Sequence, residues 1–339
     1  MKGRGRGQGR GKLLLFGEHA AVLGYPALGL ALDSGISVEL ESDGSRGSWE
    51  LDDAGKAGPG ETGATEALRE VLSRIATVIK DFPPGGLAGV RSGLPIGRGF
   101  GSSAAFCVAL SEAALVLTGR AAKARDRERL WRLAHHAEAF FHGTPSGIDT
   151  GLAALGGCIS FAPDPPRLPA WRRLKLPPLY FLVGSLPREA SAKSLIAGIR
   201  EAGLRQGSPE AMTLARLGVY SREAVVRLGG VMASLEGSGR SGRPAAPSAT
   251  ARAIGELAKS AQRDLESLGL VAPGVAALLA AGEAQGALGG KMSGAGGGGA
   301  FWLLYEGRAE AEAGKSALRA QAERQGLAAE LTLELLSTL

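Results

Sequence analysis

Apolar runs and their spacing divide this chain into strands and helices. Short apolar runs predict strands at residues 12–19, 27–32, 87–92, 156–161, 179–184, 300–305 and 327–333, and alternation of apolar and polar residues predicts a half-exposed strand at 36–42. Helical spacing predicts helices at 65–79, 106–117, 121–137, 191–202, 211–235, 250–268, 274–284 and 309–325. The predicted apolar face of the first of these helices consists of Leu68, Val71, Leu72, Ile75, Val78 and Ile79. Strands and helices are therefore interspersed along the chain.

Residues that break regular structure separate these elements. Residues 43–63 are rich in Gly, Asp and Ser, which predicts a long hairpin or surface loop. Six prolines between Pro163 and Pro178 favour a domain boundary or a crossover connection. Glycines at 218 and 229–230 mark possible interruptions of one helix, and residues 237–248 form a predicted flexible connection.

The segment 95–105 combines three glycines at alternate positions with two serines, directly before a helix. Gly97, Gly99 and Gly101 would let backbone N–H groups approach a polyanion, and the dipole of the following helix favours negative charge at that place. Ser102 or Ser103 could cap the helix or reach a phosphate-bound Mg²⁺. A flexible loop before an N-capped helix is the alternative interpretation, because 53 of the 339 residues are glycine.

Charge and composition limit the class of protein. The formal net charge is +6, but four cations (Lys2, Arg4, Arg6 and Arg10) lie in the first eleven residues, which leaves +2 for the rest. We interpret residues 1–10 as a disordered Gly/Arg arm, with RNA binding as an alternative that the lack of interleaved aromatic residues weakens. Two cysteines in apolar segments and no long apolar run predict a soluble cytoplasmic protein with reduced thiols and no membrane contact.

Two further segments contain candidate functional residues. Glu138 and Asp149 flank a run of Pro, Ser and Gly that breaks a helix, and they approach each other only if the turn folds back. A solvated helix charge for Glu138 and a turn or N-cap carboxylate for Asp149 are the alternatives. Residues 291–299 form a third glycine-rich motif before a strand.

The three motifs, in this order, resemble those of the GHMP superfamily of small-molecule kinases. Motif one is Gly11–Gly24 (GKLLLFGEHAAVLG), motif two is Leu94–Ala105 (LPIGRGFGSSAA) and motif three is Lys291–Gly299 (KMSGAGGGG). Within the superfamily, the run from His142 to Asp149 (HGTPSGID) resembles the mevalonate kinase family most. The resemblance implies an ATP-dependent enzyme that phosphorylates the primary alcohol of mevalonate. Phosphomevalonate kinase and mevalonate 3-kinase activities are the alternatives.

The resemblance also implies the fold, which is α+β in two domains with the active site in the cleft between them. The N-terminal domain, residues 11–170, would resemble domain 2 of ribosomal protein S5, and the C-terminal domain, residues 171–339, would be ferredoxin-like. A homodimer is possible, and nucleic acid is not an expected partner.

The resemblance assigns roles to individual residues. Asp149 would be the catalytic base, and Lys12 would stabilise the developing alkoxide. The residues expected to bind ATP are Pro95, Gly97, Gly99, Gly101, Ser102, Ser103, Ala104, Gly294, Gly296 and Gly297. The expected Mg²⁺ ligands are Ser103 and Glu138, and the expected substrate contacts are Glu18, His19 and Thr150.

Two single positions and one short segment depart from the family pattern. Phe100 stands where motif two usually has Leu, and we expect the core to accommodate it. Ser293 stands where motif three more often has Thr, which keeps the hydroxyl. The sequence Ala190–Lys193 replaces the common Arg-Ser-Thr-Lys, so Arg188 and Lys193 are the remaining cations that could meet a substrate carboxylate.

Overall fold

The chain forms two compact units, each built from separate stretches of sequence. The computed structural model describes residues 2–52, 61–164, 167–188, 198, 207–236 and 247–338. Unit 1 consists of Met1–Lys12, Leu30–Ile96 and Phe100–Gly157, and unit 2 consists of Leu13–Gly29, Gly97–Gly99 and Cys158–Leu339. The chain therefore passes from one unit to the other within motif one and within motif two. The predicted boundary at residue 170 stays a prediction, and the observed units change at 157–158.

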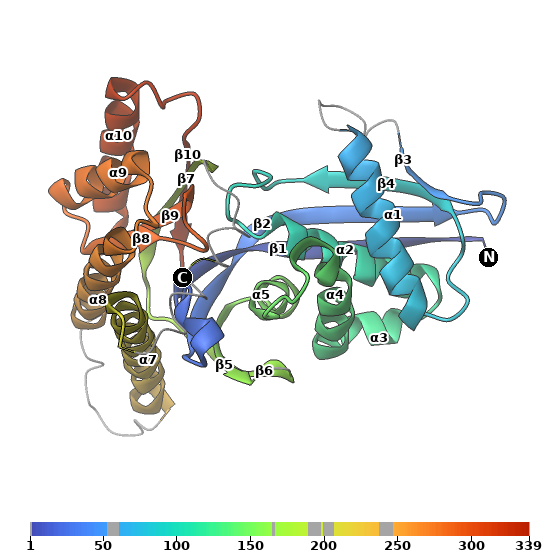
Figure 1. Cartoon of the computed structure of the whole chain (residues 1–339), viewed down its shortest axis with the longest axis horizontal. Coiled ribbons are helices and arrows are strands. Elements are labelled where there is room, and N and C mark those ends of the chain that lie inside the picture. The colour runs from blue at the N-terminus through green and yellow to red at the C-terminus, as the bar shows by residue number, and fades with distance from the viewer. Residues whose placement is uncertain are drawn as a thin grey trace. The chain divides into compact units, whose positions relative to one another are not determined.

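In its described residues, unit 1 combines a sheet with the helices α1 to α5 (Figure 1). Its elements are β1 (Gly3–Phe16) and β2 (Ala27–Ser42), which both continue into unit 2, then β3 (Trp49–Leu51), α1 (Glu61–Val78), β4 (Gly86–Ser92), α2 (Ser102–Leu117), α3 (Ala121–Arg125), α4 (Arg127–His142) and α5 (Ile148–Leu155). β1 pairs with β2, β2 pairs antiparallel with β4, and β3 pairs parallel with β4. The two strands predicted at 27–32 and 36–42 are one continuous strand, β2.

The predicted disorder of residues 1–10 is wrong for residues 3–10, which begin the long strand β1. Gly5, Gly7 and Gly9 are buried, and α2 lies directly on their backbone. A Cβ atom on any of them would lie 2.0–2.1 Å from a carbonyl oxygen of α2. The intervening arginines are on the exposed side, where Arg4 and Arg6 pair with Glu41 and Glu39 of β2 and Arg10 pairs with Asp33. The alternation of glycine with polar residues is therefore strand periodicity.

Three other predictions in unit 1 need correction. Val78, which we placed on the apolar face of α1, is exposed, whereas the other five residues of that face are buried. The single helix predicted at 121–137 is two helices, because Asp126 leaves the helical conformation and its carboxylate accepts a hydrogen bond from the Arg129 N–H as the N-cap of α4. The segment 43–63 contains β3 and the start of α1.

Unit 2 is built around a four-stranded antiparallel sheet. Its elements are η1 (Ala20–Leu23), β5 (Cys158–Asp164), β6 (Arg167–Leu174), β7 (Tyr180–Arg188), α7 (Pro209–Glu236), α8 (Pro247–Ser267), α9 (Pro273–Ala284), β8 (Gly289–Met292), β9 (Gly298–Tyr305), α10 (Arg308–Arg324) and β10 (Thr332–Ser337). The strand order β10-β7-β9-β8 places the first and third strands in the centre, as in a ferredoxin-like sheet, and α8, α9 and α10 pack on it (Figure 1). The predicted α+β, two-domain fold is confirmed.

Two expectations for unit 2 need correction, and others cannot be compared. The proline-rich segment, which we expected to form a domain boundary or a crossover connection, contains β6, which pairs antiparallel with β5. The helix α7 is not interrupted at Gly218 or Gly229. At Gly218 the Tyr25 ring lies where a Cβ would be, at 2.2 Å, so this glycine serves close packing. The predicted helix 191–202 and the connection 237–248 lie almost entirely outside the described residues.

Candidate active site

In unit 1, Lys12 contacts the first turn of α5. Lys12 is the last residue of β1 that belongs to this unit. The Lys12 Nζ lies 3.2 Å from the Asp149 Oδ2. The Lys12 side chain is 5% exposed, whereas that of Asp149 is 37% exposed, so the carboxylate can be reached from solvent while the ammonium is held inside. Gly147, in the left-handed conformation, turns the chain into α5 and thereby brings Asp149 back towards the sheet. Asp149 is a first-turn residue of α5 and not its N-cap.

Glu138 lies near this pair and is buried, with 2% of its surface exposed. It is therefore not a solvated helix charge. Burial raises the pKa of Glu138 to about 8, and the charge of Asp149 adds to this effect, while the Thr150 hydroxyl and Lys12 lower it. One ammonium thus faces two carboxylates, and the cluster has an excess of negative charge whenever both are ionised.

His142 links Glu138 to motif two. Its Nε2 lies 3.2 Å from the Ser103 Oγ and 4.0 Å from the Glu138 Oε1. His142 follows Glu138 by four residues on α4, so the two side chains share a helix face. Ser103 is in the first turn of α2. The N-cap of this helix is Gly101, and no side chain forms a capping hydrogen bond there. Ser102 and Ser103, which we considered as caps, therefore do not cap this helix.

Two features require glycine at position 101, which are its left-handed backbone conformation and the closeness of the Lys12 side chain. Gly101 has a φ of 73°, and a Cβ there would lie 2.7 Å from the Lys12 Cγ. Phe100 is buried as expected, and its carbonyl accepts a hydrogen bond of 2.9 Å from the Lys12 N–H. The end of motif two thus holds the Lys12 backbone and leaves room for its side chain.

In unit 2, the first part of motif two lies against motif three. A Cβ on Gly99 would lie 3.0 Å from the Ala300 N and 3.1 Å from the Arg188 Nη2. On the other side, a Cβ on Gly299 would lie 2.8 Å from the Arg188 Nε. The Arg188 guanidinium is therefore held against the bare backbone of two glycine-rich motifs. Lys193, the second cation we considered, lies outside the described residues.

Motif one and motif three are joined by buried polar contacts within unit 2. The Lys291 Nζ donates to the Glu18 carboxylate, the His19 Nε2 lies 3.1 Å from the Ala295 carbonyl oxygen, and the Leu14 N–H donates to the Ser293 Oγ at 2.9 Å. Burial lowers the pKa of His19 to about 4, so the ring is neutral at pH 7. Because a carbonyl only accepts hydrogen bonds, the proton of the neutral ring is on Nε2.

The predicted site residues thus fall into two groups. Unit 1 brings together Lys12, Glu138, Asp149, Thr150, Ser102, Ser103, Gly101 and Ala104, with Pro95 in the turn before them. Unit 2 holds Glu18, His19, Gly97, Gly99, Gly294, Gly296 and Gly297. All five glycines of the second group have positive φ, a backbone conformation that glycine adopts without strain. Thr150 is fully buried, and its hydroxyl donates to the Gly147 carbonyl oxygen at 3.3 Å. The assigned roles stay predictions.

Sequence reasoning gave no role to two residues in these clusters. His142 could have been found from its i,i+4 spacing to Glu138 on the same helix. Lys291 was noted only as the first residue of motif three, and its ion pair with a residue 273 positions away has no local signal.

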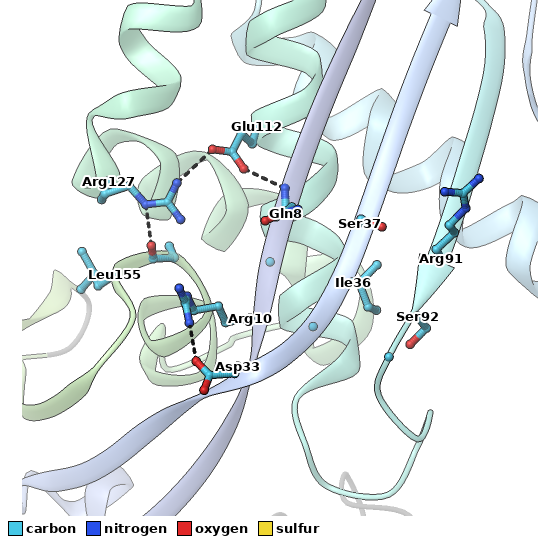
Figure 2. A pocket seen from close by; sticks show the side chains of 14 residues that line it. Gln8, Arg10, Asp33, Ile36, Ser37, Arg91, Ser92, Glu112, Arg127 and Leu155 are labelled. Carbon is cyan, nitrogen blue, oxygen red and sulfur yellow. Dashed lines mark hydrogen bonds and ion pairs between the residues drawn. The ribbon is translucent and has the colours of Figure 1, made fainter. Parts of the chain in front are cut away.

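A separate cavity in unit 1, with a volume of about 650 Å³, lies along β1 and contains none of the predicted site residues. In it, Glu112 accepts hydrogen bonds from the Gln8 backbone N–H at 2.7 Å and from the Arg127 Nη1 at 3.0 Å (Figure 2). Arg127 also donates to the Ala154 carbonyl oxygen. These contacts attach β1 to three helices, so we interpret the charged side chains here as structural.

The described residues contain neither a cluster of metal-binding side chains nor a helix suited to a membrane. No group of three or more His, Cys, Asp and Glu side chains in the described ranges could hold a metal ion. Within the same part of the chain, no helix combines the length and the apolar character needed to cross a membrane.

Comparisons with known proteins support a kinase fold. A mevalonate kinase of Thermococcus gammatolerans is 29% identical over 318 residues, which cover 86% of each chain. The crystal structure of L. major mevalonate kinase in complex with R-mevalonate has a TM-score of 0.77 at 20% identity and covers 99% of this chain and 97% of that one. A Lactococcus lactis galactokinase has a TM-score of 0.71 at 17% identity and covers 98% and 92%. The fold alone therefore does not select the substrate.

Two family descriptions match the chain directly. The GHMP kinases N terminal domain matches residues 64–157, and the GHMP kinases C terminal domain matches residues 243–324. Together these segments span more than half of the chain and include motif two, the Glu138–Asp149 segment and motif three. On this evidence the chain belongs to the GHMP kinases.

Proposed function

We propose that this enzyme transfers the γ-phosphoryl group of ATP to the primary alcohol of mevalonate and gives 5-phosphomevalonate and ADP. The observation that carries the proposal is the contact between Lys12 and the partly exposed Asp149, next to the buried Glu138. The choice of mevalonate rests on the similarity to the Thermococcus gammatolerans mevalonate kinase and on the segment from His142 to Asp149.

Asp149 acts as the general base. An alcohol is a weak nucleophile at neutral pH, so its proton must leave as the oxygen attacks phosphorus. The Asp149 carboxylate takes this proton, the new O–P bond forms, and the bond to the β,γ-bridging oxygen breaks with its electrons left on ADP. The Lys12 ammonium, 3.2 Å from Asp149, stabilises the negative charge that develops on the alcohol oxygen.

Each unit has its own candidate groups for binding phosphate, which are the N-terminus of α2 in unit 1 and the glycine-rich segments with Arg188 in unit 2. In unit 1, the backbone N–H groups in the first turn of α2 and the dipole of this helix suit phosphate oxygens. In unit 2, Gly97, Gly99, Gly294 and Gly296 let the backbone adopt conformations in which further N–H groups face an anion, whereas the Gly297 N–H donates to the Leu270 carbonyl oxygen. Arg188, held against Gly99 and Gly299, supplies a fixed positive charge with several donors.

The residues present fit Mg²⁺. Ser103 and Glu138 offer hard oxygen ligands, and the excess of one carboxylate over the single Lys12 ammonium favours a cation at this place. Two protein ligands are enough for Mg²⁺, which takes its other ligands from phosphate and water. The bound ion would neutralise charge on the β- and γ-phosphates.

The chain's own features favour a cytoplasmic enzyme, because Cys107 and Cys158 are both free and buried. We propose that compartment for the reaction.

A coupled assay of ADP release tests the proposal with mevalonate, phosphomevalonate, galactose and homoserine as acceptors. We expect turnover with mevalonate at a kcat/KM at least about 100-fold above that of the other alcohols, because a site built for one polar substrate leaves groups unpaired with the wrong one. Turnover of phosphomevalonate in preference to mevalonate would assign the chain to the neighbouring kinase. ADP release that does not depend on any alcohol would contradict the proposal altogether.

A further inference from the structure

Three buried contacts connect the end of β1 and the residues after it to the end of β8 and the loop that joins β8 to β9, all within unit 2. Leu14, Glu18 and His19 on one side meet Ser293, Lys291 and Ala295 on the other. We call these six residues the clasp. The loop that they hold contains Gly294, Gly296 and Gly297.

Lys291 is the central member of the clasp. Its side chain has no exposed surface, and its Nζ donates to the Glu18 carboxylate and, at 2.7 Å, to the Met292 carbonyl oxygen. The ammonium also lies 5.9 Å from the ring centres of Phe16 and Trp302. Aromatic faces stabilise a desolvated cation, so the charge is fixed between two rings and one carboxylate.

A buried ion pair of this kind fixes position more than it adds stability. Desolvation offsets most of its Coulomb attraction, and an apolar pair of similar shape is often as stable. Hydrogen bonds from an ammonium to a carboxylate and a carbonyl, however, allow only a narrow range of positions. The clasp therefore specifies where the loop starts, and the contacts of Ser293 and Ala295 hold the next residues.

The same contacts occupy Glu18 and His19. Glu18 is 5% exposed and bound to Lys291, and His19 is 8% exposed, neutral and hydrogen-bonded through its Nε2–H. His19 also has a φ of 57°, which is unfavourable for a residue other than glycine and persists only where surrounding contacts hold it. The side chains of both residues thus bind motif three.

We propose that Lys291, with Glu18 and His19, is a positioning residue that holds the glycine loop 293–299 in the conformation that binds nucleotide phosphates. On this view, Glu18 and His19 act through the loop. The inference rests on the proposed function, because it assumes that the loop binds ATP.

The test compares Lys291→Met with the double variant Glu18→Leu/Lys291→Met. The single variant leaves a buried carboxylate without its partner, so we expect a lower melting temperature and a higher Kd for a non-hydrolysable ATP analogue with Mg²⁺. The double variant removes both charges, so we expect its melting temperature to return close to that of the wild type while the Kd stays about tenfold higher, as for the loss of one charge-assisted hydrogen bond.

One control variant and one further test variant complete the experiment. Arg216→Gln removes another ion pair of unit 2, to Asp264 on α8, and we expect an unchanged nucleotide Kd. Ser293→Ala removes the acceptor of the Leu14 N–H without leaving a charge unpaired, so it raises the Kd even if the charge variants do not fold. The KM for the alcohol, measured at saturating ATP, is expected to stay within about twofold of wild type in Ser293→Ala.

Wild-type nucleotide affinity in both the double variant and Ser293→Ala would overturn the proposal, since the clasp would then serve only stability. Nucleotide binding is measured without any alcohol, so this result is separate from the identity of the substrate. A wild-type protein that binds the ATP analogue but does not turn over mevalonate would reject the proposed function and leave the clasp to be judged on the variants.

Discussion

Replacement of Glu138 by Gln is expected to make the metal-free protein more stable at pH 8 while it impairs catalysis. Glu138 is buried, and burial and Asp149 together raise its pKa to about 8 from an ordinary value of 4.5. At pH values between the pKa of the unfolded chain, 4.5, and that of the folded protein, about 8, the folded protein keeps a proton on Glu138 that the unfolded chain has lost. Raising the pH through this range therefore lowers the free energy of unfolding. The amide side chain of the variant has no proton to lose, so Glu138→Gln lacks this pH dependence.

The size of the effect follows from the pKa. Where the folded state binds one proton more than the unfolded state, the free energy of unfolding falls by about 1.4 kcal/mol per pH unit. Between pH 5 and pH 8 this amounts to about 4 kcal/mol. With an unfolding entropy of about 2.1 cal/mol/K per residue, a chain of 339 residues has about 0.7 kcal/mol/K, so the melting temperature falls by about 6 °C.

Thermal melting of both proteins in EDTA, from pH 5 to pH 8, measures this effect. The melting temperature of the wild type relative to Glu138→Gln is expected to fall by about 6 °C over this range. Glu128→Gln, on the exposed first turn of the same helix α4, is the matched control and is expected to follow the wild type at all pH values. Parallel curves for the wild type and Glu138→Gln would refute the reasoning, because Glu138 would then titrate alike in the folded and unfolded states.

Four further outcomes are expected. Asp149→Asn lowers kcat by about 10²–10⁴, the usual range for a lost general base, with ATP binding retained in calorimetry; near-normal turnover would reject Asp149 as the base. In the wild type, Mg²⁺ must displace the proton of Glu138, so Mg²⁺-dependent stabilisation in the presence of ADP rises from pH 6 to pH 8, and a flat profile would argue against this ligand. Gly7→Val places side-chain atoms against the Ala109 carbonyl oxygen and destabilises the protein by about 3 kcal/mol in urea, whereas Arg6→Ala changes stability by less than about 0.5 kcal/mol; equal effects would contradict the packing of α2 on β1. Arg188→Gln raises the KM for ATP about tenfold, with partial recovery in Arg188→Lys, and an unchanged KM would exclude Arg188 from the phosphate site.

The periodicity of the chain predicted most elements, because burial of one face of a helix or strand leaves a pattern in the sequence. The helices α1, α2, α8, α9 and α10 and the strand β9 lie close to their predicted ranges. The exceptions have local causes. Asp126 ends one helix and caps the next, a signal that a continuous amphipathic pattern concealed.

The N-terminal residues show why composition can mislead. Glycine and arginine together suggested disorder, because neither provides apolar surface. The glycines at 5, 7 and 9 instead form the face of β1 against which α2 packs. Because glycine has no Cβ atom, the backbones of β1 and α2 can approach closely. The alternation was visible in the sequence, but the helix that makes it necessary is about a hundred residues away.

The candidate site was predictable in its residue types and only partly in its contacts. The run from His142 to Asp149 and the motif at Lys12 indicated a carboxylate and an ammonium group. The structure places the Asp149 Oδ2 and the Lys12 Nζ 3.2 Å apart. The clasp could not be predicted, because Glu18 and Lys291 meet only through the folding of unit 2, and no local spacing records that contact.

The position of the phosphate on the product tests the central claim most directly. The enzyme is incubated with ATP, Mg²⁺ and mevalonate, and the product is analysed by phosphorus and carbon nuclear magnetic resonance. We predict a single phosphate monoester on the primary carbon, formed in equal amount to ADP. A phosphate on the tertiary hydroxyl, or ADP without a phosphorylated alcohol, would contradict the account.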